Sequence, residues 1–488
     1  MHNGWAVFLA LIGTALAIVG VASGCGSSSS AQTPAADAGD ASTADVSMPP
    51  EAMDTGIDIN QDPNVYPAHH HAIPQIDYNG GPVLQHPQVV TVTFVGDAQR
   101  DSWRAFDHFV TTSGWWQQTA ESFCIEDGGP YNGECVGNGT AAAPDGGEWI
   151  PDGSTADGGD GYLDVELPYD FPSMSITDDE IQAWLAGHVN AGDFPAPDPG
   201  TISQTIYALH FPSTTSVSPG GGSPPLCAPE GYGIILGYHY QVAVIPPGSS
   251  TPVTVAYAVL PFCDLGEGNY GNFQVATTTA SHEISEAATD PRPADLPAFY
   301  LHSNDAWAGS LSLAGGECGD LCENVNNNTY EDPDASDGYT VQRIWSNQAA
   351  AQSMNPCQPW PNTYYGAALR TTPQMVNDHL SDGYVFVKRG QTVNVIADVF
   401  AQAPLPHDLQ LYVGQNKGPF ATLDPSDVAP PGDDITVTLS QSQVNNGDGI
   451  VVTFSVPSNG AVGDYPVVIR SVLSTNDYND WPVLVHVE

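Results

Sequence analysis

The chain alternates between short apolar runs, typical of strands, and stretches with a helical period. In its central part, β-branched and aromatic residues gather in four runs that predict buried strands. These runs cover residues 89–94, 205–211, 240–245 and 253–260. Between them, two stretches carry apolar residues on one helical face, and the second opens on a capping box formed by Thr177 and Glu180. We therefore expect residues 78–365 to form an α+β domain of the metallohydrolase-like kind.

The hydrophobic pattern of the C-terminal part differs, because strand-like runs follow one another without a competing helical period. Seven such runs cover residues 384–387, 392–400, 408–413, 435–439, 450–456, 465–472 and 481–487. Turn-forming residues separate them. Seven short strands within about a hundred residues are typical of an immunoglobulin-like β-sandwich, which we place at residues 366–488.

An apolar run at residues 6–22 is too short and too close to the N-terminus to predict a membrane span. It is typical of the apolar region of a signal peptide, and the Val-Ala-Ser-Gly that precedes Cys25 resembles a bacterial lipoprotein signal covering residues 1–25. Residues 1–5 contain no Lys or Arg, so an ordinary signal peptide is the alternative. Both interpretations export the chain, and lipidation of Cys25 would hold it on a membrane face without a spanning helix.

Residues 26–77 are rich in Ser, Ala, Asp, Pro and Thr and show no hydrophobic period, which predicts a disordered acidic tether. Near its end lie three consecutive histidines, His69, His70 and His71. A histidine run can bind a metal loosely, but no carboxylate or cysteine frames this one. We expect a solvated loop there.

The charge of the chain excludes several classes of partner. Nine Lys and Arg residues against 56 Asp and Glu residues give a formal net charge of −47. Nucleic acids and anionic membrane surfaces would repel such a protein, so we expect no nucleic-acid partner and membrane contact only through the lipid anchor. Hydrophobic residues make up 41% of the chain, enough for a sizeable core.

Seven cysteines remain besides Cys25, and an exported chain can keep disulfides. Sequence alone does not fix their connectivity, and an odd number leaves one thiol unpaired. We choose Cys318 as the unpaired thiol. Our choice of disulfides is Cys124–Cys135, Cys227–Cys263 and Cys322–Cys357.

Residues 277–291 predict a helix that ends at an Asp-Pro step and contains His-Glu-x-x-Glu. His282 and Glu286 are four residues apart, so they share one helix face and can both bind a divalent metal. The next Lys or Arg after this motif is Arg292, whereas a solvated helix face usually carries basic partners. A buried site compensated by a cation follows from this pattern. The alternative is an ordinary charge-assisted pair of His282 and Glu286 without a metal.

A second segment, at residues 316–323, offers further carboxylates, and either Glu317 or Asp320 would complete the ligand set. We expect Zn²⁺, with Ca²⁺ as the alternative. Glu283 would take the proton of a metal-bound water and pass it to a leaving amine. His239 is our choice for stabilising the developing oxyanion, its alternative being a loop histidine satisfied by backbone groups. The reaction class is peptide or amide hydrolysis.

Three segments occur in the same order as in the plant EXORDIUM-like (phosphate-induced protein 1) family. They are the Gly-Tyr-His turn at 237–239, the His-Glu-x-x-Glu helix, and Glu-x-Gly-Asp-Leu-Cys at 317–322. Over roughly residues 81–359 the chain resembles that family and related bacterial exported proteins. The resemblance implies an extracellular protein and no settled reaction. The helix is also similar to the zinc-peptidase signature His-Glu-x-x-His, with Glu286 in place of the second histidine.

These patterns lead to one main expectation and two alternatives. The main one is an exported, lipid-anchored, zinc-dependent hydrolase that acts on a peptide or protein substrate. The first alternative is a non-catalytic cell-surface binding protein with a structural metal site and a cell-wall or glycan ligand. The second is a surface protein of the EXORDIUM type that contains no metal.

Overall fold

The computed structural model describes residues 59–126, 128–137, 163–194, 197, 203–220, 223–228, 235–264, 272–302, 305–311, 315–332, 338–376, 379–415 and 434–488. The predicted signal peptide, its lipidation site Cys25 and residues 26–58 of the predicted tether lie outside these ranges. The described residues from Asn60 onward cluster into one unit by their contacts.

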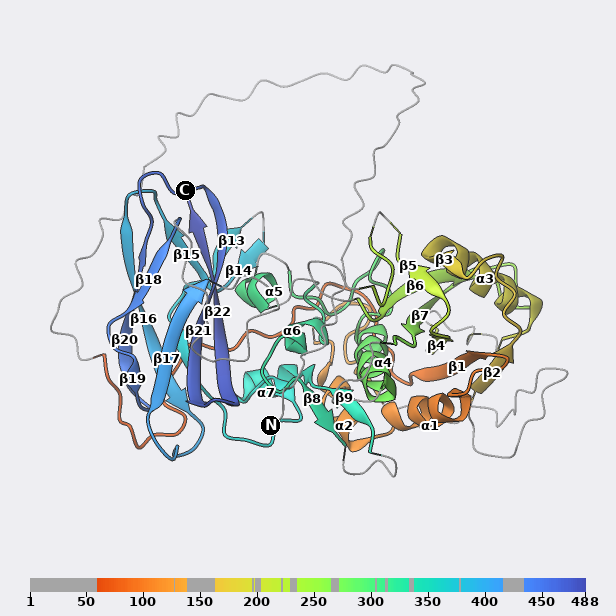
Figure 1. The fold of residues 1–488 in the computed structure, drawn as a ribbon, viewed down its shortest axis with the longest axis horizontal. Coiled ribbons are helices and arrows are strands. Elements are labelled where there is room, and N and C mark those ends of the chain that lie inside the picture. The colour runs from red at the N-terminus through yellow and green to blue at the C-terminus, as the bar shows by residue number, and fades with distance from the viewer. Residues whose placement is uncertain are drawn as a thin grey trace, which may run out of the picture. The chain divides into compact units, whose positions relative to one another are not determined.

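A five-stranded sheet of order β2-β1-β4-β7-β6 forms the centre of the first part (Figure 1). Its strands are β1 (Gln88–Phe94), β2 (Leu163–Leu167), β4 (Thr205–Phe211), β6 (Tyr238–Val244) and β7 (Val253–Pro261). The first four in spatial order pair in parallel, and β6 pairs antiparallel to β7. Parallel neighbours require crossover connections, and helices occupy several of them.

Helices cover both faces of this sheet. They are α1 (Arg100–Val110), α3 (Asp178–Ala191) and α4 (Asn272–Thr289). Alternate residues of β4 enter different cores: Ile206 and Ala208 pack with α1 and α4, whereas Tyr207 and Leu209 pack with α3. Burial on both faces explains why β4 is apolar along its length instead of alternating.

The expected α+β metallohydrolase-like fold is wrong. Helices hold 18% of the described residues and strands 35%, divided among several sheets. The sequence pattern located β1, β4 and β7, but it carried no information on the direction in which they pair. They pair in parallel through crossovers, so helices lie on both faces and are not segregated from the sheet.

Shorter elements complete the first part and form three two-stranded sheets, β3-β5, β8-β9 and β10-β11. They are α2 (Gly114–Gln118), η1 (Ala120–Ser122), β3 (Ser175–Thr177), β5 (Ser216–Ser218), α5 (Ala306–Leu311), α6 (Asp320–Glu323), β8 (Thr329–Glu331), β9 (Thr340–Gln342), β10 (Ile344–Trp345), α7 (Asn347–Ala351) and β11 (Cys357–Gln358).

Three disulfides join the pairs that we chose from the sequence, and Cys318 is buried and unpaired. The bonded pairs are Cys124–Cys135, Cys227–Cys263 and Cys322–Cys357. Because disulfides persist in oxidising compartments, the chain is an extracellular or surface protein. Among the described residues, no helix combines the length and the apolar character needed to cross a membrane.

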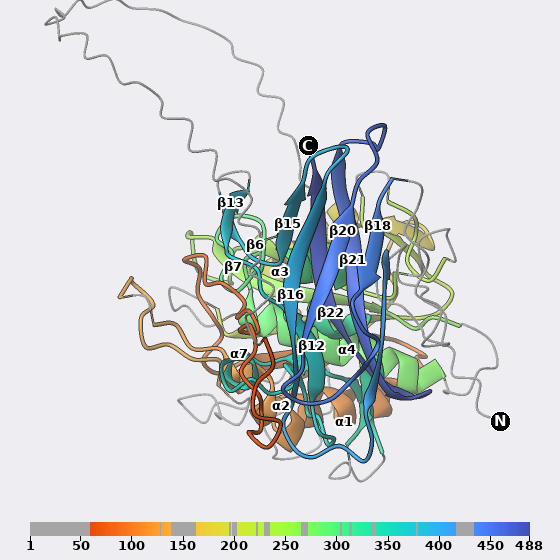
Figure 2. The ribbon, with the colours of Figure 1, turned by 90° about the vertical axis from the view of Figure 1, so that its left-hand side faces the viewer.

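Two larger sheets make up the second part (Figures 1 and 2). The first contains β12 (Tyr365–Leu369), β16 (Thr392–Ala401), β20 (Gly449–Ser455) and β18 (Thr436–Leu439). The second contains β15 (Tyr384–Val387), β22 (Asp477–Val487), β21 (Gly463–Ser474), β17 (Leu409–Gln415) and β19 (Gln443–Val444), and β13 (Gln374–Val376) pairs separately with β14 (His379–Ser381). Val452 and Phe400 of the first sheet share one core with Val483 and Ile469 of the second. The immunoglobulin-like topology itself stays a prediction.

Residues 60–77, which we assigned to the disordered tether, are bonded into the fold. Residues 61–71 pack onto this second part, whereas Ile76 is hydrogen-bonded to Asn347 of α7 in the first part. His70 is buried and stacks on Phe400 with ring centroids 3.8 Å apart. His71 Nε2 lies 2.6 Å from Asp382 Oδ2. The expectation of a solvated histidine loop is therefore wrong, because a carboxylate and an aromatic ring far along the chain supply the partners that local sequence lacks.

The start of α5 is held by a buried carboxylate. Asp305 Oδ1 accepts a hydrogen bond from the Trp307 backbone N–H (2.8 Å), and Oδ2 accepts one from the Asp382 N–H (3.4 Å). The ring of Trp307 then packs edge-on against Trp345 and Trp481. Burial raises the pKa of Asp305 to about 7, and the nearby charge of Asp382 adds to the increase.

We expect Asp305→Asn to change how stability depends on pH. The folded-state pKa lies above the unfolded value, so the contribution of the protonated carboxyl is complete below about pH 4 and is lost as the pH rises through about 7. Between pH 5 and pH 8.5, the free energy of unfolding of the wild type should therefore fall relative to that of the variant by on the order of 2 kcal/mol. Denaturant titrations at both pH values measure this, with the exposed Asp179→Asn as control. A wild-type-to-variant difference that is the same at both pH values would contradict the assignment.

Candidate metal centre

Helix α4 carries three buried side chains that could bind a metal, one imidazole and two carboxylates. Apart from Phe273 near its start, its apolar residues are small or branched, and Ala280, Ile284 and Ala287 pack into the core beneath the central sheet. Small side chains let the helix lie close to its neighbours, so its polar residues are enclosed as well. His282, Glu283 and Glu286 are each fully buried.

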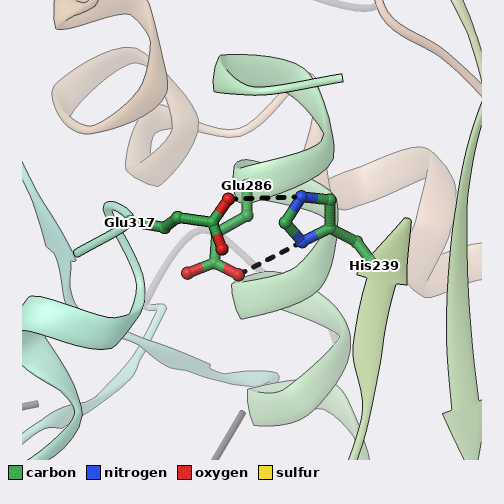
Figure 3. A group of neighbouring side chains, drawn as sticks. All are labelled: His239, Glu286 and Glu317. Atoms are coloured by element: carbon green, nitrogen blue, oxygen red, sulfur yellow. Dashed lines mark ion pairs between the residues drawn. The ribbon is translucent and has the colours of Figure 1, made fainter. Parts of the chain in front are cut away.

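Two other segments bring further ligand-type side chains to the same place. Strand β6 contributes His239, whose side chain is 2% exposed and points toward α4 (Figure 3). Glu317 precedes α6, and Asp320 is the first residue of that helix. All six residues that the sequence singled out thus lie in one buried cluster, with Glu317 the most exposed, at 14% of its side chain.

Glu286 lies at the centre of this cluster and faces both imidazoles. Its Oε1 lies 3.0 Å from His282 Nε2, which in turn lies 3.7 Å from Asp320 Oδ1. Its Oε2 lies 3.4 Å from His239 Nδ1, and His239 Nε2 lies 3.5 Å from Glu317 Oε1 (Figure 3). The residues form two groups that share Glu286: one adds His282 and Asp320, and the other adds His239 and Glu317. In each group, one ligand-type atom from every residue lies within 4.8 Å of the others.

The orientation of His282 is set by Gln342 of β9, a residue that our sequence analysis missed. Gln342 Nε2 donates to the Gly319 carbonyl (2.7 Å), which turns Oε1 of the amide toward the imidazole. His282 Nδ1 then donates to that oxygen at 3.0 Å. With the proton on Nδ1, the lone pair of a neutral imidazole lies on Nε2, which faces Glu286 and Asp320.

Several buried polar atoms of the cluster have no hydrogen-bond partner. They are both ring nitrogens of His239, Nε2 of His282, both carboxylate oxygens of Glu283, Oε2 of Glu286 and Oδ1 of Asp320. Burying so many unsatisfied polar atoms is costly. A divalent cation would satisfy them together, because imidazole nitrogens and carboxylate oxygens are common ligands of Zn²⁺. The residues present fit such an ion.

The electrostatics of the cluster show how strongly it attracts positive charge. Burial alone would lower the pKa of His239 and of His282, but Glu317 raises the first and Glu286 the second well above the usual range. Although burial opposes it, the pKa of Glu286 is lowered to about 2, chiefly by His282. Burial raises the pKa of Glu283 and raises that of Asp320 well above its ordinary value. Protons on the two imidazoles can therefore act as counter-charges, which a metal ion would displace.

Gly319 allows α6 to approach α4 closely. A Cβ at this position would lie 2.6 Å from His282 Nδ1 and 2.8 Å from Glu286 Oε1. The backbone N–H groups of Gly319 and Asp320 both donate to that same oxygen, at 3.1 and 3.2 Å. The geometry of the site therefore requires glycine at position 319. Its place between the two candidate carboxylates Glu317 and Asp320 is the sequence signal that could have identified this requirement.

Comparisons with known proteins assign no relative. No protein-family description and no curated protein matches the chain. Among solved structures, the S-layer protein SbsC matches at 17% identity over 26% of this chain and 13% of that chain, with a TM-score of 0.17. A nucleoside hydrolase-related hypothetical protein from Saccharophagus degradans matches at 12% identity over 83% of this chain and 100% of that chain, with a TM-score of 0.21. TM-scores of this size carry no argument about fold or function.

Gly319→Ala should disturb the site through a single added methyl group. We expect the free energy of unfolding to fall by about 1–3 kcal/mol, because the methyl group overlaps His282 and Glu286. The matched control is Gly187→Ala on the exposed face of α3, where an added Cβ contacts nothing and should leave stability unchanged or raise it by up to about 1 kcal/mol. Denaturant titration compares the two variants. Equal stabilities would rule out the close packing of α6 on α4.

Proposed function

We propose that this chain is an exported, zinc-dependent hydrolase of peptide or amide bonds. The observation that carries the proposal is the convergence of two imidazoles and several carboxylates in one buried cluster whose ligand-type atoms lack partners. His282, Glu286 and Asp320 are the residues that would hold the ion, because they lie on one side of the cluster within ligand distance of one another. The ion would supply Lewis acidity toward the scissile carbonyl.

Glu283 is the residue that we assign to proton transfer. Neither of its oxygens has a hydrogen-bond partner, and the ion-pair contact of Oε2 with His239 Nδ1 is long, at 3.8 Å. In the proposed reaction, the carboxylate accepts a proton from the attacking water while the water oxygen bonds to the carbonyl carbon. The same proton then passes to the amine nitrogen as the carbon–nitrogen bond breaks.

The complete burial of His282, Glu283 and Glu286 favours a second candidate, a non-catalytic surface protein with a structural metal. Catalytic metal sites keep a position open to water and substrate, whereas structural sites are closed. If the site is catalytic, a substrate would approach it past Glu317 and Tyr300, which are both partly exposed and interact electrostatically. In this second case the ligand of the protein would be a glycan or a cell-wall component, and the resemblance to EXORDIUM-like proteins would extend to function.

The anchoring of the protein is part of the proposal. We place a lipid on Cys25, on the pattern of residues that precedes it. In a bacterial host that processes lipoproteins, the wild type should sediment with membranes, and Cys25→Ala should not be lipidated. Fractionation and mass spectrometry of the mature N-terminus measure both. A wild-type N-terminus without acyl chains would exclude the anchor.

Glu283→Gln should separate the two candidate functions. We expect the variant to keep its zinc, because Glu283 is not among the proposed ligands, and to lose turnover by about a hundredfold or more, because the proton acceptor is removed. Hydrolysis is measured on a quenched-fluorescent peptide library, and zinc is measured by elemental analysis of the same samples. Glu331→Gln, a change of an exposed carboxylate on β8, is the matched control.

Each outcome of that experiment discriminates. Loss of turnover with zinc retained supports the hydrolase. Zinc bound by a wild-type protein that cleaves no peptide supports the structural site and excludes the hydrolase. A wild-type protein that binds no divalent ion at all excludes both candidates.

A further inference from the structure

The cluster contains more ligand-type atoms and more charge than one ion accounts for. Besides the carboxylates of the proposed zinc site, the cluster contains those of Glu283, Glu317 and Glu323. The last of these belongs to it through electrostatic interaction with His282 and Asp320. The five buried or nearly buried carboxylates are Glu283, Glu286, Glu317, Asp320 and Glu323. None of them forms an ion pair with any described Lys or Arg, whose carboxylate partners lie elsewhere in the chain.

A count of charge indicates how many cations the cluster requires. Burial raises the pKa of every one of these carboxyls except Glu286, so their full ionisation requires cations nearby. With all five ionised the cluster would carry −5, and one divalent ion beside neutral imidazoles would leave −3. Two divalent ions leave −1. Because an uncompensated charge is expensive to bury, the second arrangement is the more stable of the two.

The geometry divides the ligands in the same way. The two carboxylate oxygens of Glu286 face two different imidazoles, with Oε1 toward His282 and Oε2 toward His239. Each imidazole has a second carboxylate beside it, Asp320 in one case and Glu317 in the other. His239 is nearly fully buried, and neither of its ring nitrogens has a hydrogen-bond partner. Figure 3 shows its ring directed at Glu286 and Glu317, so its position suits a ligand better than the oxyanion-stabilising role that we expected.

We infer that the cluster binds two divalent cations bridged by Glu286. One is held by His282, Glu286 and Asp320, and the other by His239, Glu286 and Glu317. The second position goes beyond the proposed zinc hydrolase while resting on its first site. A carboxylate that bridges two ions is typical of sites that place a water and a substrate oxygen on neighbouring metals. The inference therefore assigns His239 and Glu317 to metal binding.

The stoichiometry of metal binding tests this inference. The full exported chain is dialysed against excess Zn²⁺, freed of unbound metal and measured by elemental analysis. We expect two ions per chain in the wild type, one in Glu317→Gln, one in Asp320→Asn and two in the exposed control Glu331→Gln. Glu317→Gln preserves side-chain size at a partly exposed position, and circular dichroism checks that each variant is folded.

The possible results separate the two claims. One ion per wild-type chain would overturn the two-ion inference and leave the proposed hydrolase intact, whereas no ion would overturn both. A second measurement does not depend on the variants. The Mn²⁺-loaded wild type should give the electron paramagnetic resonance spectrum of a spin-coupled pair, and the spectrum of isolated Mn²⁺ alone would overturn the bridge.

Discussion

The buried negative charge around Glu286 is the constraint on which the rest of this structure depends. Carboxylates from α4, from the segment before α6 and from α6 itself meet where no described Lys or Arg reaches them. Such a cluster is stable only when a positive charge accompanies it. In the chain alone, protons offset the charge: the nearby carboxylates raise the pKa of His239 and of His282. Burial also raises the pKa of Glu317 and of Asp320, which favours their neutral forms. A metal ion would replace those protons with a charge that does not depend on pH in the same way.

The packing of α4 against the central sheet and of α6 against α4 encloses this charged cluster. Helix α4 lies on one face of a sheet whose other face is also covered, so its polar side chains cannot reach solvent past the sheet. Close approach by α6 closes the remaining side, and it is possible because position 319 has no side chain. The hydrogen bond from His282 to Gln342 then fixes the ring. Packing and polar contacts therefore both preorganise the ligand atoms.

The sequence predicted the positions of many elements but not their arrangement. The strands β1, β4 and β7, the capping box of α3 and most strands of the second part follow from local periodicity, which is a short-range property. Pairing direction is long-range, and this is why the fold class was wrong. Strand β12, rich in Gly and Ala, has too weak a pattern to be recognised. Residues 60–77 likewise look disordered, because the partners of their histidines lie some 300 residues away.

The site was more predictable than the fold, since His-Glu-x-x-Glu places its side chains by helical geometry alone. The structure brings the six residues named from the sequence together, although their roles in metal binding and catalysis stay predictions. Gln342 and the role of Gly319 were not foreseen, and Glu323 was included only as one of the carboxylates of the segment 316–323. Gln342 lies 60 residues from its partner His282, and only tertiary packing makes it a neighbour. Glu323 looks like an ordinary helix-end acid until its burial is known.

The disulfide between Cys322 and Cys357 has a consequence for the order in which the mature protein is assembled. Cys322 lies two residues after Asp320, so the bond ties the ligand-bearing turn to β11. That tie forms only after the chain has left the reducing cytoplasm. The turn that carries Asp320 is therefore fixed covalently to β11 only after export.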